Sequence, residues 1–157
     1  MPEMRLPGPD HPITVAVNPK RVQVEYNGHV IADTRRALVL RESTYPAVQY
    51  IPREDVAMAF MSPTEHRTYC PYKGYASYHT ILMDGRFAEN AVWSYEDPYP
   101  AMSQIKAHLA FYPNKAEIRE LDEPDGAEAI RDAIEHTDTG SGASQLDHAK
   151  PNVSLPR

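Results

Sequence analysis

The only cysteine of the chain lies in a short segment, Thr-Tyr-Cys-Pro-Tyr-Lys-Gly, that spans residues 68–74. Lys73 follows Cys70 after three residues, and an ammonium group close to a thiol favours loss of the thiol proton. Gly74 then lets the backbone turn. This segment is therefore the first candidate for a site, with Cys70 as a nucleophile and Lys73 as a group that activates a carbonyl or holds an anion.

Catalysis at Cys70 would also need a group that accepts a proton. His79 or His66 could act as this base, and Glu42 could orient the base or take up the proton if the fold brings it near. The alternative is that Cys70 is a small buried apolar side chain, which is a common state of a free cysteine. Spacing along the chain leaves both interpretations open.

Aromatic side chains are concentrated in residues 45–112, where nine of the ten tyrosines occur together with the only tryptophan. Flat side chains with polar tips can wall a pocket for a planar ligand. The candidates for this role are Tyr50, Tyr72, Trp93 and Tyr95, and Trp93 shares a strand face with Tyr95. The other interpretation is an aromatic core in which each hydroxyl group has a hydrogen-bond partner.

Motifs for metals and nucleotide cofactors are not found. Seven histidines occur without any pair at the three-to-five-residue spacing of a local zinc motif, and one cysteine cannot form an internal disulfide. The sequence also lacks GxGxxG, Walker and GxSxG motifs. We therefore expect neither a metal site nor a cofactor; the alternative is a metal held by residues of distant strands, for example His66, Cys70 and His79.

Charge is distributed unevenly along the chain, whose formal net charge is −6. Residues 1–121 contain 13 basic and 14 acidic side chains, a net charge of −1, and residues 122–157 contain 3 and 8, a net charge of −5. Neither part has the clustered Lys and Arg of a nucleic-acid-binding surface. No apolar run approaches the roughly 20 residues of a membrane helix, and no signal peptide is recognisable, so we expect a cytoplasmic protein without membrane contact.

The sequence predicts three parts: a proline-rich arm over residues 1–18, a β-rich core over residues 19–121, and an acidic extension over residues 122–157. In the extension we expect a short helix at 126–136, followed by a mobile tail at 137–157. Alternation in the arm at Ile13, Val15 and Val17 indicates an edge strand.

Within the core, two-residue turns predict two hairpins, at Asn27-Gly28 and Asp84-Gly85. Further strands are expected at 37–41, 47–51 and 115–121, and short helices begin at Pro52 and Pro100. Many short strands with two or three short helices predict a mostly β fold of the α+β type, either a barrel or a pair of packed antiparallel sheets.

Several motifs in order resemble the domain of unknown function 427 family over about residues 11–121. They are His11-Pro-Ile-Thr-Val, Arg21-Val-x-Val, Gly28-x-x-Ile-Ala-Asp33, Tyr50-Ile-Pro-Arg-Glu-Asp-Val56, the segment 68–74, Asn90-Ala-Val-Trp-Ser-Tyr-Glu-Asp-Pro98 and Phe111-Tyr112. The resemblance implies a β-tent-like fold, two antiparallel sheets pitched against each other with an open pocket. Zinc-binding exchange-factor-like chaperones and the thalidomide-binding domain of cereblon share that fold.

Two properties associated with this resemblance lack their residues here. Zinc in the tent relatives needs paired CxxC motifs, and this chain has Cys70 alone. The family is sometimes labelled a nucleotidyltransferase domain, but no Gly-Ser motif is followed by the paired aspartates that would hold magnesium.

Three functions are compatible with these observations. The first is binding of a small planar or anionic molecule in an aromatic pocket, with Lys73 and Glu42 as its polar contacts. The second is an enzyme in which Cys70 or Lys73 reacts with the substrate while His79 or Glu42 moves protons. The third is an interaction module, in which the arm and the acidic extension bind a partner or a second copy of the chain as a homodimer.

Overall fold

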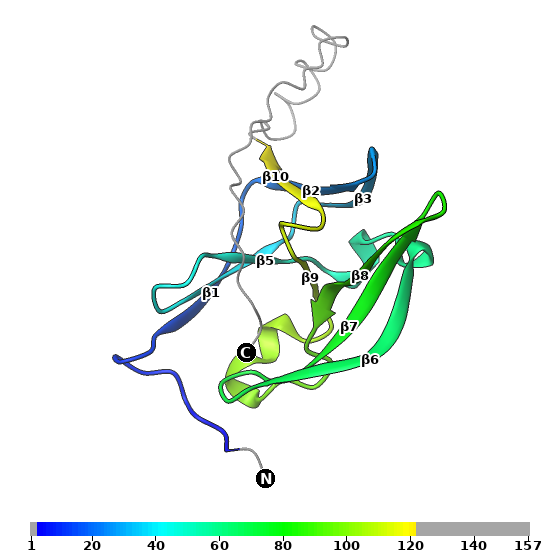
Figure 1. The fold of residues 1–157 in the computed structure, drawn as a ribbon. Helices are drawn as coiled ribbons and strands as arrows, with labels where there is room; N and C mark the ends of the chain where they lie inside the picture. Colours follow the sequence, from blue (N-terminus) through cyan, green and yellow to red (C-terminus); the bar gives the residue numbers. More distant parts are fainter. Residues whose placement is uncertain (1–2, 122–157) are drawn as a thin grey trace, which may run out of the picture.

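The computed structural model describes residues 3–121, whose secondary structure consists mainly of antiparallel strands (Figure 1). Hydrogen bonds divide the strands of this part into three sheets, with the orders β1-β4-β5, β10-β2-β3 and β6-β7-β8-β9. The predicted mostly β class is confirmed, with three sheets where the resemblance implied two. The strands are β1 (Ile13–Val17), β2 (Arg21–Tyr26), β3 (His29–Thr34), β4 (Leu38–Glu42), β5 (Val48–Tyr50), β6 (Met61–Cys70), β7 (Gly74–Met83), β8 (Arg86–Ser94), β9 (Leu109–Phe111) and β10 (Glu117–Leu121).

Both predicted hairpins are present. Asn27 and Gly28 join β2 to β3 with φ values of 52° and 82°, and Asp84 and Gly85 join β7 to β8 with 55° and 75°. Positive φ at both central residues is what a two-residue turn needs to match the twist of its strands, and it favours Asn, Asp and Gly at these positions. Local sequence therefore sets these two turns.

Strand β6 was not predicted from the sequence. It pairs with β7 over most of its ten residues, but its register shifts between Pro63 and Arg67. Proline and charged residues weaken a strand pattern, yet an edge strand with a bulge tolerates both because one of its edges needs no partner. The position of β6 at the edge of its sheet thus explains why its sequence does not alternate.

Three short 3-10 helices complete the described part: η1 (Arg53–Asp55), η2 (Met58–Phe60) and η3 (Pro100–Ile105). Two of them, η1 and η3, begin beside or at Pro52 and Pro100, the two prolines that predicted helical turns. Met102 and Ile105 of η3 are buried, and Leu109, four residues after Ile105, lies in β9.

Buried apolar side chains of residues 3–121 form two clusters. Val92 belongs to one cluster and its neighbour Trp93 to the other, as expected for adjacent residues of a strand, whose side chains point to opposite faces of the sheet. Ile51 and Leu109 exchange two backbone hydrogen bonds of 2.8 Å, which join the β1-β4-β5 sheet to the β6-β7-β8-β9 sheet. The β6-β7-β8-β9 sheet is therefore tied to the β1-β4-β5 sheet through β9, at the edge opposite to β6.

The N-terminal segment contacts the rest of the fold at two places. The predicted edge strand of the N-terminal segment is β1, which pairs with β4, and the Arg5 amide donates to the Pro71 carbonyl at 2.8 Å. The acidic extension and its expected helix lie outside the described residues. None of the helices in residues 3–121 has the length and apolar content needed to cross a membrane.

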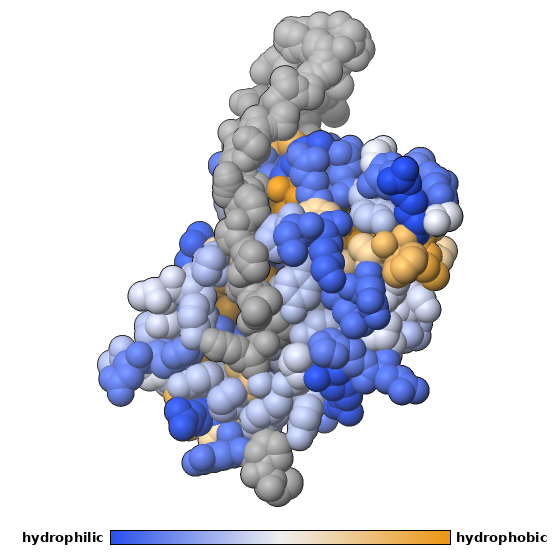
Figure 2. Space-filling view, viewed as in Figure 1, coloured by the Kyte–Doolittle hydropathy of each residue, from blue (hydrophilic) through white to orange (hydrophobic). Residues whose placement is uncertain are grey.

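The visible surface is largely polar (Figure 2). An apolar patch lies over the end of the β7–β8 hairpin. Leu82 and Phe87, which face each other in this hairpin, are both exposed.

Candidate functional site

The segment 68–74 forms the end of the β6–β7 hairpin. Cys70 is the last residue of β6, and its carbonyl accepts a hydrogen bond from the Lys73 amide at 3.2 Å. Gly74 begins β7 with φ of +108°, a conformation that side chains disfavour, and a β-carbon added there would lie 3.6 Å from the Asp97 carbonyl oxygen. The cysteine and lysine are thus held by a tight turn that this glycine permits.

Three of the five residues named for catalysis, Cys70, Lys73 and Glu42, meet at this turn. The Lys73 ammonium donates to Glu42 Oε1 at 2.6 Å and approaches Cys70 Sγ at 3.6 Å. Glu42 is the last residue of β4, so the contact joins two sheets. All three side chains are buried, with 0% exposure for Cys70.

His11 completes the buried cluster and was not selected from the sequence. Its Nε2 lies 2.7 Å from Glu42 Oε2, and its ring stacks on Tyr72 at 4.2 Å with an interplanar angle of 5°. Burial of Glu42 disfavours its charge, but Lys73 and His11 outweigh that effect and lower the pKa of the carboxyl group. The one signal that could have found His11 is the motif that begins with it.

The chemistry of this cluster is that of an ion pair. Glu42 accepts hydrogen bonds from Lys73 on one side and contacts His11 on the other, so its two oxygens are both used. Cys70 has no exposed surface, and a thiol reacts with a substrate only if the substrate can reach it. The cluster therefore fastens the β6–β7 turn to the end of β4.

The four predicted ligand-binding aromatics lie in or against one apolar cluster. Tyr50, Trp93 and Tyr95 are each at most 1% exposed, and Trp93 Nε1 donates to Tyr50 Oη at 3.1 Å. Tyr72 packs against this cluster from its edge. Burial raises the pKa of Tyr50 and of Tyr95 above its ordinary value, and the Tyr95 hydroxyl has no hydrogen-bond partner within residues 3–121.

Of the two histidines considered as the base, His66 is exposed on β6 beside the Tyr78 ring, and His79 lies on β7. Burial lowers the pKa of His79, the nearby Arg53 lowers it further, and Glu96 opposes them. Its Nδ1 is buried and has no hydrogen-bond partner in the described part of the chain. The structure thus separates His79 from the Cys70 turn that it was expected to serve.

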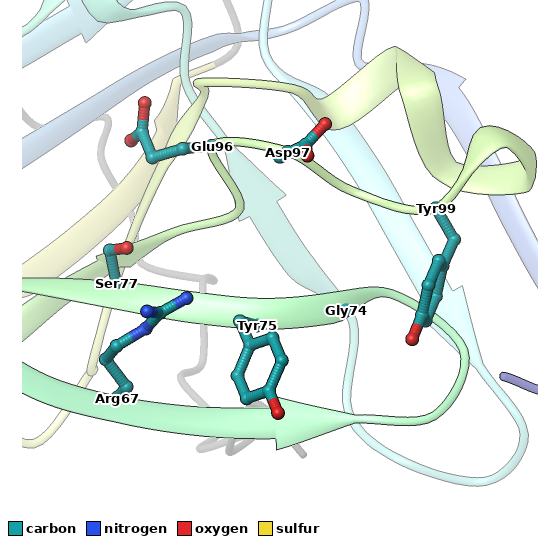
Figure 3. A pocket seen from close by; sticks show the side chains of 7 residues that line it. All are labelled: Arg67, Gly74, Tyr75, Ser77, Glu96, Asp97 and Tyr99. Atoms are coloured by element: carbon teal, nitrogen blue, oxygen red, sulfur yellow. The ribbon is translucent and has the colours of Figure 1, made fainter. Parts of the chain in front are cut away.

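An open pocket of about 280 Å³ lies near the same hairpin, between β6 and β7 on one side and the segment after β8 on the other (Figure 3). Sequence reasoning missed it, although two of its segments belong to motifs that carry the resemblance. The pocket is lined by Arg67, Gly74, Tyr75, Ser77, Glu96, Asp97 and Tyr99.

One wall of the pocket carries a cation beside an aromatic ring. Arg67 on β6 faces Ser77 on β7 in the strand register, and its guanidinium carbon lies 4.8 Å from the centre of the Tyr75 ring. Arg67 is exposed, and no carboxylate within residues 3–121 forms an ion pair with it. A guanidinium held in this way can bind a carboxylate through two parallel hydrogen bonds.

The opposite wall is acidic and is fixed by backbone and side-chain contacts. Glu96 forms an ion pair with Arg53 and accepts a hydrogen bond from the Ser94 hydroxyl. The Tyr99 amide donates to the Lys73 carbonyl at 3.0 Å, which ties the segment to the β6–β7 turn. Asp97 lies between these two anchors and has no ion-pair partner in the described residues.

No group of three His, Cys, Asp or Glu side chains within residues 3–121 is arranged to hold a metal ion. A family model described as a domain of unknown function (DUF427) matches residues 14–122, more than half of the chain, and includes every pocket residue. A comparison with curated proteins finds no matching relative.

Proposed function

The chain belongs to the DUF427 family, a domain of unknown function, so its activity must be inferred from its own residues, and we propose that it binds a small planar anion. The ligand occupies the pocket between the β6–β7 hairpin and residues 96–99. Its anionic group contacts Arg67, and its ring lies against Tyr75 and Tyr99.

The proposal rests mainly on the exposed side chain of Arg67, unpaired within residues 3–121. Its guanidinium is exposed at the pocket, lies over the Tyr75 ring at 4.8 Å, and has no carboxylate partner in the described residues. Contact with the ring restricts the side chain, so less conformational entropy is lost when an anion binds. The Ser77 hydroxyl on the neighbouring strand supplies a further donor for the same anion.

Pocket size narrows the class of ligand. Pockets for drug-sized ligands have volumes of about 300–1,000 Å³. A volume of about 280 Å³ lies just below that range and suits a molecule with one ring better than a nucleotide cofactor. Tyr75 is exposed and Tyr99 is half-buried, and both line the pocket. They favour a planar ring, because offset stacking of aromatic groups adds to the apolar contact.

Binding is tested by titrating benzoate into the isotopically labelled full chain and following the backbone amide resonances by NMR. We expect shifts at Tyr75, Ser77 and Asp97, and a decrease in affinity as salt is added, because exposed charges are screened. Arg67→Gln should weaken binding about tenfold, the equivalent of about 1.4 kcal/mol.

Arg86→Gln is the matched control, because Arg86 is an exposed arginine at the opposite end of the same sheet. It should bind benzoate as the unmodified chain does. Unchanged affinity in Arg67→Gln, or equal losses in both variants, would show that the anion does not use this pocket.

A further inference from the structure

The two walls of the pocket differ in charge, and this difference restricts the ligand more than size does. Arg67 lies on β6, whereas Glu96 and Asp97 belong to the segment on the other side of the pocket (Figure 3). Glu96 is paired with Arg53, but neither Arg67 nor Asp97 has an ion-pair partner within residues 3–121. The pocket therefore has one uncompensated cation and one uncompensated carboxylate, on opposite walls.

We infer that the ligand is amphoteric, with one anionic group for Arg67 and, at the other end of its ring, an ammonium group or similar donor for the Asp97 wall. This inference rests on the proposed function and names the chemical class that the same pocket accepts. An ammonium group there gains an attractive interaction with Asp97, while Arg67 is satisfied by the carboxylate.

The acidic wall also acts against competing ligands. A dianion that binds Arg67 through one end would bring its second charge towards Asp97 and Glu96, and repulsion between like charges lowers its affinity. Selection by repulsion is effective in a pocket where the favourable contact alone would not distinguish two anions. The Arg53 and Ser94 contacts hold Glu96 in place, so the wall keeps its position when the ligand binds.

Three acids with the same benzene ring test this inference: benzoate, 4-(aminomethyl)benzoate and terephthalate. Each is titrated into the full chain at low ionic strength, and the dissociation constants are compared by NMR and calorimetry. Relative to benzoate, we expect 4-(aminomethyl)benzoate to bind about fivefold tighter and terephthalate about fivefold weaker, the range of an exposed charge interaction.

Two variants assign these differences to the walls. Asp97→Asn should bring the dissociation constants of 4-(aminomethyl)benzoate and terephthalate close to that of benzoate, so that both ratios approach one. The reason is that it removes the charge that distinguishes the three compounds. Arg67→Gln should weaken all three. Glu89→Gln, which changes an exposed acid of β8 outside the pocket, is the control and should leave the ratios unchanged.

Failure of the inference and failure of the proposed function give different results. Suppose that benzoate binds and that its binding depends on Arg67. If terephthalate then binds as tightly as 4-(aminomethyl)benzoate, or if Asp97→Asn leaves the ratios of dissociation constants unaltered, the ligand is not amphoteric. The proposed anion pocket would still stand. If none of the three compounds shifts the resonances of the pocket residues, the proposed function fails together with the inference.

Discussion

Removing the Lys73 ammonium should destabilise the fold by an amount that depends on what remains around Glu42. The two side chains are 3% and 6% exposed, and their charged atoms lie 2.6 Å apart. Loss of one partner from a buried pair costs about 3–5 kcal/mol, because the other charge stays buried without compensation. In Lys73→Met, Glu42 keeps its contact with the half-buried His11, so we expect the lower end of the range, about 3 kcal/mol.

Removing the Glu42 carboxylate instead should lower the free energy of unfolding by more. In Glu42→Leu the Lys73 ammonium keeps Cys70 Sγ at 3.6 Å and the Tyr95 ring, whose centre is 6.0 Å away. Sulfur is a weak acceptor and the ring is distant, so we expect about 4–5 kcal/mol. The double variant Lys73→Met with Glu42→Leu removes both charges. Its loss should be clearly smaller than the sum of the single losses, because neither charge is left alone.

Urea unfolding of the full chain measures these differences. The fluorescence of Trp93, the only tryptophan, reports the transition, and the midpoint and slope give the free energy of unfolding. Lys106→Met, at an exposed lysine, is the control and should stay within about 0.5 kcal/mol of the unmodified chain. The buried, coupled pair would be refuted if Lys73→Met lost no more free energy of unfolding than this control. It would also be refuted if the double variant lost the full sum of the two single losses.

The pH dependence of the same measurement gives a second check. The folded-state pKa of Glu42 is lowered, so the unfolded chain binds more protons than the folded chain as the pH falls. The stabilisation by the Glu42 charge is fully present above the ordinary pKa of 4.5 and is lost as the pH falls through the lowered value. The difference between Lys73→Met and the unmodified chain should therefore decrease in acid.

Three more predictions concern the other residues selected from the sequence. Trp93→Ala should lower the free energy of unfolding by about 3–5 kcal/mol, since Trp93 is 1% exposed, and near-normal stability by urea unfolding would contradict its place in the core. Cys70 should react with iodoacetamide far more slowly in the folded chain than in urea, as followed by mass spectrometry, and equal rates would show an accessible thiol. The lowered folded-state pKa of His79 means that stability decreases as the pH falls through the ordinary value of 6.5. His79→Gln should make this decrease smaller between about pH 7.5 and 5.5, and an unchanged slope would count against a buried neutral ring.

Local sequence determined much of the fold. The Asn27-Gly28 and Asp84-Gly85 turns were predictable because positive φ at two successive residues selects a few residue types, and such a turn sets the pairing of its two strands. The mostly β class followed from these turns and from short alternating segments. Strand β6 escaped prediction because its edge position and bulge relax the alternation that a fully paired strand requires.

Sequence also selected Cys70 and Lys73, since they share one turn, but it gave no means of knowing that the turn is buried. Glu42 meets Lys73 from 31 positions away, and His11 meets Glu42 across the same separation. Only the packing of one sheet on another decides such contacts, because burial depends on which surfaces the folded chain brings together.

The open pocket illustrates the same limit. Arg67 and Ser77 become neighbours through the register of β6 and β7, and Asp97 reaches them because the segment after β8 folds back onto the Lys73 turn. Shifting a register by one residue would turn these side chains to the other face of the sheet. The residue types were present in the sequence, whereas tertiary structure alone decided which of them line one pocket open to solvent.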